Sequence, residues 1–242
     1  MSQFTVLGVI PARGGSRRVP QKNIRPLDGQ PLIAFTIKAA AESTLLTRTV
    51  VSTDSDAVAQ VAIKHGGDVP FRRPAELATD EALDRPYLLH AVNWFERQNG
   101  ALPDAVALLR PTTPFKSGRL IDDAILLLRE SGADSVRSLT LVEGVHHPFW
   151  MFNVDATGRL MAFDTENNIG KFPRSQQLPR LHRLNGVIEV IRTATLRDPG
   201  QDTYGSDIRM IEVPPGLAHD IDTEADFALC DALAKARRLA RP

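Results

Sequence analysis

Short apolar runs alternate with helix-period patterns over residues 4–141, and this alternation restricts the fold more than any other feature of the chain. The runs that predict strands lie at 4–10, 49–53, 69–71, 105–109 and 135–141, the run at 69–71 being the weakest. Apolar residues spaced three and four apart predict a helix that begins at Pro31 and further helices at 55–65, 86–98 and 119–130. This order is typical of βαβ units, so we expect an α/β three-layer sandwich on a mainly parallel sheet.

The alternation stops at about residue 143. Two apolar stretches, at 149–154 and 159–163, flank Gly158 in the pattern of a hairpin, and the residues after them are polar and irregular. We therefore expect residues 143–183 to form an excursion within one domain that spans residues 1–242. Strands at 186–191 and 208–213 then return to the core. The last helix, at 223–239, begins with the Thr-x-x-Asp capping pattern of Thr223 and Asp226.

Composition excludes several classes of protein. The 29 Lys and Arg residues balance the 29 Asp and Glu residues, so no global field attracts nucleic acid or an anionic membrane. Cys230 is the only cysteine, which excludes an intrachain disulfide and a Cys-rich zinc site. The N-terminus lacks a signal-peptide pattern, and no run of about 18 apolar residues occurs. We therefore expect a cytoplasmic protein with no membrane and no nucleic-acid partner.

A basic, glycine-containing loop follows the first predicted strand. Gly14 and Gly15 allow backbone N–H groups to turn toward a phosphate, and Ser16 adds a hydroxyl. The sequence matches neither GxxxxGK[ST] nor GxGxxG, which argues against a P-loop or dinucleotide site. We predict an anion site here, because ligands bind at the carboxyl ends of parallel strands; the alternative is a solvated basic loop. Its cations are Arg13, Arg17, Arg18, Lys22 and Arg25.

Two aspartates precede the last predicted helix. Asp220 and Asp222 flank Ile221, and in an extended segment residues i and i+2 point to the same side. Mg²⁺ binds one or two protein carboxylates and completes its octahedron with water and phosphate oxygens. The pair thus fits a metal site for Mg²⁺. The alternative is that Asp222 or Thr223 simply caps the helix.

The segment IPARGGSRRVPQKN at 10–23 resembles the N-terminal signature of the acylneuraminate cytidylyltransferases, the CMP-sialic acid synthetase family, which includes legionaminic and pseudaminic acid enzymes. The resemblance extends along nearly the whole chain, and the number and order of its motifs make it specific. The further motifs are STD at 52–54, RRPAELA at 72–78, LRPTTP at 109–114, HHP at 146–148, QQLP at 176–179, RLNG at 183–186 and HDIDT at 219–223.

The resemblance implies a Rossmann-like fold of the nucleotide-diphospho-sugar transferase type. It also implies Mg²⁺-dependent transfer of CMP from CTP to the anomeric hydroxyl of a nine-carbon 2-keto sugar acid, with release of pyrophosphate. Most of the catalysis would then come from positioning and charge neutralisation. The residues implied to be catalytic are Arg13, Lys22, Asp220 and Asp222. Those implied to bind the nucleotide are Ala12, Arg13, Gly14, Ser16, Lys22, Asn23 and Arg73.

The sugar-acid side departs from the sialic acid pattern. Arg110 stands where many sialic acid enzymes have Gln, as in legionaminic and pseudaminic acid variants, and Ser175 stands where the family has Arg. Arg, unlike Gln, forms a two-pronged salt bridge with a carboxylate, so we expect a legionaminic-type substrate; the alternative is a structural ion pair of Arg110. Glu189 replaces a common aromatic residue. The implied substrate-binding residues are Arg110, Thr112, Gln176, Arg183 and Asn185.

Adjacent His146 and His147, if in a strand, would point to opposite faces, so at most one would reach the substrate.

Three further expectations concern partners and alternatives. Residues 143–183 are too few to bury their own apolar side chains, and the family dimerises there, so we expect a homodimer through this excursion, which would also cap the substrate. The first alternative activity is a cytidylyltransferase for another 2-keto acid such as Kdo. The second is a non-catalytic nucleotide- or sugar-binding module on the same fold. The apolar residues concerned are Phe149, Trp150, Met151, Phe152 and Met161.

Overall fold

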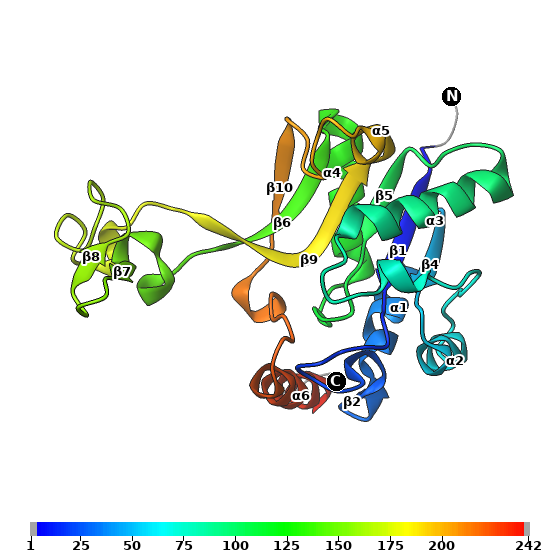
Figure 1. Cartoon of the computed structure of the whole chain (residues 1–242), viewed down its shortest axis with the longest axis horizontal. Helices are drawn as coiled ribbons and strands as arrows, with labels where there is room; N and C mark the ends of the chain where they lie inside the picture. Colours follow the sequence, from blue (N-terminus) through cyan, green and yellow to red (C-terminus); the bar gives the residue numbers. More distant parts are fainter. Residues whose placement is uncertain (1–3, 240–242) are drawn as a thin grey trace.

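The computed structural model describes residues 4–239 and confirms the α/β sandwich (Figure 1). Its central sheet has the strand order β10-β6-β9-β5-β1-β4, in which β1 pairs in parallel with β4 and β5, β10 pairs in parallel with β6, and β9 is antiparallel to both neighbours. The sheet is therefore mainly parallel, as expected. The strands are β1 (Val6–Pro11), β4 (Arg48–Ser52), β5 (Ala105–Leu108), β6 (Ser135–Leu141), β9 (His182–Arg192) and β10 (Ile208–Glu212).

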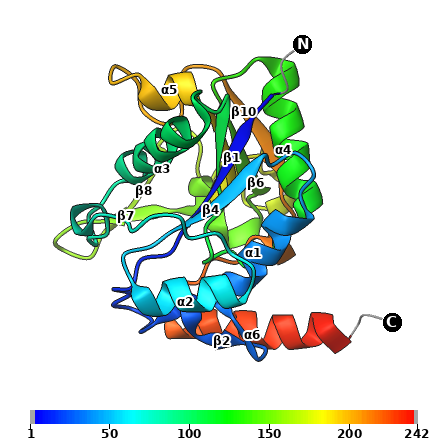
Figure 2. The same cartoon turned by 90° about the vertical axis from the view of Figure 1, so that its right-hand side faces the viewer.

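Helices cover both faces of this sheet, because successive strand residues are apolar on both sides. Val6 and Ile10 of β1 belong to the core under the first group of helices, whereas Leu7 and Val9 belong to the core under the second. Figure 2 shows the two groups on opposite sides of the sheet. The first comprises α1 (Leu32–Glu42), α2 (Asp56–Lys64) and α4 (Gly118–Ser131), and the second α3 (Asp84–Asn99) and α5 (Thr193–Arg197).

The expected strand at 69–71 is absent, and this prediction was wrong. Only the flanking residues make backbone contacts with β4 and its end: Arg72 forms an isolated parallel bridge with Thr53, and Val51 donates its N–H to Asp68 O. Pro70 lies in the middle of the run and has no N–H to donate to a ladder, which prevents a strand. The chain here instead forms a loop that carries Arg73 back to the end of β4.

The excursion projects from the body on the ends of β6 and β9 (Figure 1). It contains the antiparallel hairpin of β7 (Phe152–Val154) and β8 (Leu160–Ala162), in which Phe152 is opposite Ala162. Many of its large apolar side chains are exposed, by up to 74% at Val145. The others include Met151, Phe152, Val154, Leu160, Met161, Phe163 and Ile169.

The terminal helix α6 (Glu224–Leu239) packs against the basic loop and the short hairpin of β2 (Pro26–Leu27) and β3 (Gln30–Pro31). The predicted capping pattern is present: Asp226 N donates to Thr223 Oγ1, and Thr223 N and Oγ1 both donate to Asp226 Oδ2. Ile221, just before the helix, is fully buried with Leu27 and Phe227. This packing brings the two aspartates to the loop after β1. Among the helices within residues 4–239, none is long and apolar enough to cross a membrane.

Candidate functional site

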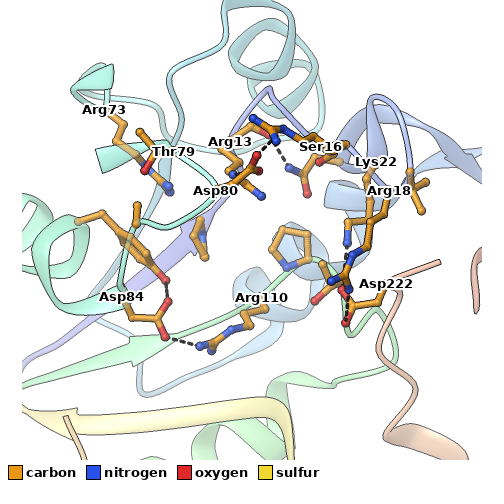
Figure 3. Close-up of a pocket in the computed structure, with 18 of the residues that line it drawn as sticks. Arg13, Ser16, Arg18, Lys22, Arg73, Thr79, Asp80, Asp84, Arg110 and Asp222 are labelled. Carbon is orange, nitrogen blue, oxygen red and sulfur yellow. Dashed lines mark hydrogen bonds and ion pairs between the residues drawn. The ribbon is translucent and has the colours of Figure 1, made fainter. Parts of the chain in front are cut away.

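A cavity of about 590 Å³ lies at the carboxyl ends of β1, β4 and β5 (Figure 3). The loop after β1 forms one wall, and residues 77–84 form another. The turn after β5 and the segment before α6 complete it. Its polar lining residues are Arg13, Ser16, Arg17, Arg18, Lys22, Asn23, Arg73, Thr79, Asp80, Asp84, Tyr87, Arg110, Thr112, Asp220 and Asp222.

The loop after β1 presents its side chains to this cavity, but two of its backbone N–H groups are already bonded. Ala12, fully buried, donates to Ser52 O, and Gly14 donates to Asp54 Oδ1 at 2.9 Å. A Cβ on Gly14 would lie 2.7 Å from Ser55 Cβ, so glycine is needed there for packing. Ala12 and Gly14 therefore support the loop, whereas the other implied nucleotide-binding residues of the loop, Arg13, Ser16, Lys22 and Asn23, line the cavity.

Carboxylates already pair with the loop's cations. Arg13 and Arg17 each contact Asp80 at 2.5 Å, and Lys22 Nζ lies 3.6 Å from Asp222 Oδ1. An anion that enters the cavity therefore competes with Asp80 for two guanidinium groups. No helical or strand periodicity marks Asp80, so the sequence did not indicate this role.

Arg73 is buried and fixed in place at the end of β4. Its Nε donates to Ser52 Oγ at 2.9 Å, one Nη donates to Ser52 O at 2.7 Å, and its guanidinium lies 4.5 Å from the centre of the Tyr87 ring. Desolvation lowers the pKa of Arg73 below its ordinary value. The side chain is a rigid part of the cavity wall, and its implied contact with the nucleotide stays a prediction.

Asp220 and Asp222 both line the cavity, as the i, i+2 spacing predicted. Desolvation raises the pKa of Asp220, and the nearby Asp222 carboxylate adds to the effect, whereas a hydrogen bond with Thr112 opposes it. A divalent cation would relieve this like-charge repulsion, and two carboxylates in one cavity with the cations of the loop after β1 fit the donor set that Mg²⁺ takes together with an anionic ligand. Residues 4–239 contain no cluster of three His, Cys, Asp or Glu for a metal held by protein alone.

A second cavity, of about 500 Å³, adjoins the first, and Arg110 and Asp220 line both. The predicted residues Arg183 and Asn185 line the second cavity, and Thr112 the first. The side-chain amide of Asn185 is hydrogen-bonded within the protein: its Oδ1 accepts from Ser138 Oγ, and its Nδ2 donates to Thr140 Oγ1. Arg183 makes no ion pair within residues 4–239, which makes it an open cation here.

Gln176 lines neither cavity. It lies in the short 3-10 helix Ser175–Gln177 of the excursion, which projects away from both sites (Figure 1).

His146 ends the 3-10 helix Gly144–His146, and His147 lies between that helix and the next, Pro148–Trp150, so neither is in a strand and the alternating-face expectation does not apply. A ring nitrogen of buried His147 lies 3.1 Å from Pro179 O, which gives this histidine a structural role within the excursion.

Arg110 is held by a carboxylate from each cavity. Its Nη2 contacts Asp84 at 2.5 Å in the first, and its Nη1 contacts Glu189 at 2.6 Å in the second. Glu189 also pairs with Arg137, a buried arginine that lies over the Tyr204 ring. The ion-pair alternative for Arg110 is thus confirmed, while contact with a substrate stays a prediction. The sequence marked Glu189 only as a departure from the family pattern, and it gave no indication that Asp84 and Arg137 take part in this ion-pair network.

The sequence comparisons agree with one another. A family model described as Cytidylyltransferase matches residues 7–178. The chain is 34% identical over 231 residues to a CMP-N,N'-diacetyllegionaminic acid synthase of Legionella pneumophila, covering 94% of this chain and 95% of that protein. It is 36% identical over 230 residues to a pseudaminic acid cytidylyltransferase of Campylobacter jejuni, covering 95% and 96%.

Solved structures share the fold. A CMP:2-keto-3-deoxy-manno-octonic acid synthetase in complex with CTP superimposes with a TM-score of 0.72 at 18% identity, covering 96% of this chain and 99% of that one. A 4-diphosphocytidyl-2C-methyl-D-erythritol synthase of Anaerococcus prevotii gives a TM-score of 0.64 at 11% identity, covering 97% and 100%.

Asp80 and an entering anion compete for Arg13. Asp80→Asn should strengthen binding of inorganic tripolyphosphate about threefold to tenfold, because it removes both a competitor for Arg13 and a charge that repels the anion. Isothermal titration calorimetry measures this affinity. Asp123→Asn, the same change on the exposed face of α4, should leave it unchanged. An unaltered dissociation constant in Asp80→Asn would contradict the competition.

Proposed function

The chain belongs to the cytidylyltransferase family, and we propose that it transfers CMP from CTP to the anomeric hydroxyl of a nine-carbon 2-keto sugar acid, releasing pyrophosphate. One observation carries this proposal: two cavities, one lined by cations after β1 and one lined by Arg183, meet at Arg110 and Asp220. A reaction between two bound substrates needs adjoining sites of this kind.

The first cavity suits the nucleotide. Arg13, Ser16 and Lys22 surround the space for a triphosphate, and rigid Arg73 would frame the base. The second cavity suits the sugar acid, whose carboxylate would pair with the open Arg183. The acceptor oxygen and the α-phosphate would then meet beside Arg110.

Catalysis in this arrangement rests on positioning and charge. The anomeric hydroxyl releases its proton as its oxygen attacks the α-phosphorus, the bond to the leaving phosphate oxygen breaks, and negative charge gathers on pyrophosphate. Arg13 and Lys22 line the cavity where that charge would develop, so they would stabilise it once the anion has displaced Asp80 from Arg13. Asp220 and Asp222 would hold Mg²⁺, which supplies polarisation of the α-phosphate.

Two alternatives remain as outcomes of the same assay. The fold neighbour solved with CTP is named for an eight-carbon keto acid, so Kdo belongs in the substrate panel. A non-catalytic module is disfavoured because all four proposed catalytic residues line one cavity.

A homodimer is part of the proposal. The excursion exposes apolar side chains from both strands of its hairpin, including Phe152 and Leu160, which a second copy of the chain would cover. Gln176 lies on this excursion, so it would reach a substrate only in the partner's site. We also propose a cytoplasmic location, with which a buried Cys230 thiol, its pKa raised by burial to about 11, is compatible.

Loss of either metal-site carboxylate should abolish most activity. Asp222→Asn and Asp220→Asn should each lower kcat on the order of a hundredfold, because each removes a stabiliser of the developing charge. Pyrophosphate release measured over a Mg²⁺ titration checks this, with Asp123→Asn as the charge-matched control. Near-normal turnover in Asp222→Asn with an unchanged Mg²⁺ dependence would refute the assignment.

The sugar acid should be of the legionaminic type. We expect kcat/KM to be highest for a di-N-acylated legionaminic acid in a CTP assay that includes pseudaminic acid, N-acetylneuraminic acid and Kdo. Arg110→Gln should reduce this preference, and Glu189→Gln, which removes the partner of Arg110 in the second cavity, should do so too. A preference for N-acetylneuraminic acid would overturn the expectation, and an unaltered preference in Arg110→Gln would remove its stated cause.

The excursion should determine the oligomeric state. Light scattering should give twice the 26.6 kDa mass of one chain for the parent protein, and one chain for Leu160→Glu. Leu160 is 61% exposed on β8, whereas Ile63, 59% exposed on α2, offers a matched control in which Ile63→Glu stays dimeric. A parent protein of one-chain mass at micromolar concentration would exclude the dimer.

A further inference from the structure

Lys116 is a buried cation directly behind the turn that joins the two cavities. Its side chain lies in the interior, and it lines neither cavity. Its Nζ donates to Arg110 O at 2.7 Å, to Thr113 Oγ1 at 3.1 Å, to Thr36 Oγ1 at 3.4 Å and to Thr113 O. The ammonium therefore closes the turn of residues 110–113 from within.

Burial of the Lys116 ammonium is unfavourable for the free energy of folding. Within residues 4–239 no carboxylate lies within ion-pair distance of Lys116, and its partners are neutral oxygens. Desolvation, together with the positive charge of Arg110, lowers the pKa of the Lys116 ammonium to about 7, and the more distant Asp220 carboxylate only partly opposes this shift. Burial of an ammonium without a counter-ion opposes folding, so an apolar side chain of similar length would satisfy packing at lower cost. The charge thus calls for an explanation beyond packing.

The turn that Lys116 closes holds other parts of the site. Arg110 lines both cavities, and Thr112 O accepts the Ile221 N–H at 2.9 Å. The Thr112 side chain also favours the charged form of the Asp220 carboxyl, whose pKa it lowers. The other end of the turn reaches β9, since Thr113 Oγ1 lies within 3.4 Å of Gly186 O. A shift of the turn would therefore displace Arg110 and the aspartate segment together.

We propose that Lys116 is a positioning residue, whose buried ammonium fixes the turn 110–113 and through it the relative placement of Arg110 and the Asp220–Asp222 segment. This role rests on the proposed function, because it concerns the geometry in which the two substrates meet. Lys116 acts through the turn and touches neither substrate. A misplacement of reacting groups by about 1 Å lowers the reaction rate on the order of a hundredfold.

The test compares Lys116→Met, which removes the charge at similar length, with Lys116→Arg, which keeps it. Lys116→Met should lower kcat on the order of 10- to 100-fold and raise the Mg²⁺ concentration for half-maximal rate, with the KM for CTP changed less than threefold. Lys116→Arg should recover most of the loss. Thr36→Val, which removes only the longest contact, is the control and should behave as the parent protein.

A second readout needs no substrate. Hydrogen exchange at the Ile221 amide, which donates to Thr112 O, should accelerate in Lys116→Met, while exchange in the buried strands β1 and β5 stays as in the parent protein. A general loss of stability would instead accelerate exchange in the strands as well. If the parent protein released no pyrophosphate with any acid, the proposed function would fail, and this exchange measurement would still decide the role of Lys116.

Two results would overturn the proposal. One is a folded Lys116→Met protein whose kcat, Mg²⁺ dependence and Ile221 exchange all lie within twofold of the parent. The second result concerns the case in which circular dichroism shows that Lys116→Met does not fold. The variant Thr113→Val is then measured instead, because it keeps the lysine and removes one of the acceptors of its ammonium. We expect a several-fold loss of kcat and faster Ile221 exchange in that variant, and parental values would refute the proposal.

Discussion

The site depends on the hydrogen bonds of one residue, Ile221. Its N–H donates to Thr112 O at 2.9 Å, its carbonyl accepts from Lys22 Nζ at 2.5 Å, and its side chain is fully buried between the basic loop and α6. These contacts join the loop after β1, the turn after β5 and the start of the last helix. Without them the two flanking aspartates would not face the cations. The buried Lys116 closes the same turn from the other side.

Paired charges explain how a chain of zero net charge builds a site for highly charged substrates. Arg13 pairs with Asp80, Lys22 lies near Asp222, and Arg110 lies between two carboxylates, so most cations are neutralised before a ligand arrives. Binding of a polyphosphate then exchanges one anionic partner for another. Such exchange avoids leaving a desolvated charge unpaired, which is the costly event in partly buried sites.

Local sequence signals located most of the elements. The β-branched run at 49–53 and the apolar run at 135–141 became β4 and β6, and the capping pair Thr223 and Asp226 marked the start of α6. The prediction of a strand from an apolar run was wrong at 69–71, because Pro70 in the middle of that run prevents a strand. The strand β9, at His182–Arg192, is longer than the predicted 186–191, because it continues through an irregularity near Gly186, at φ +64°, across which period-2 patterning is lost.

The amino-acid sequence by itself determined the α/β class, the basic loop after β1 and the paired aspartates, because each depends on residues close together in the chain. Tertiary structure decided which residues that are far apart in the sequence contact one another. Asp84 and Glu189 lie 26 and 79 residues from Arg110, yet both contact its guanidinium. Nothing in the local sequence marks Lys116 as buried, and only the packing of the turn against Thr36 places it in the interior. Burial and long-range pairing depend on the assembled sheet, which no local pattern encodes.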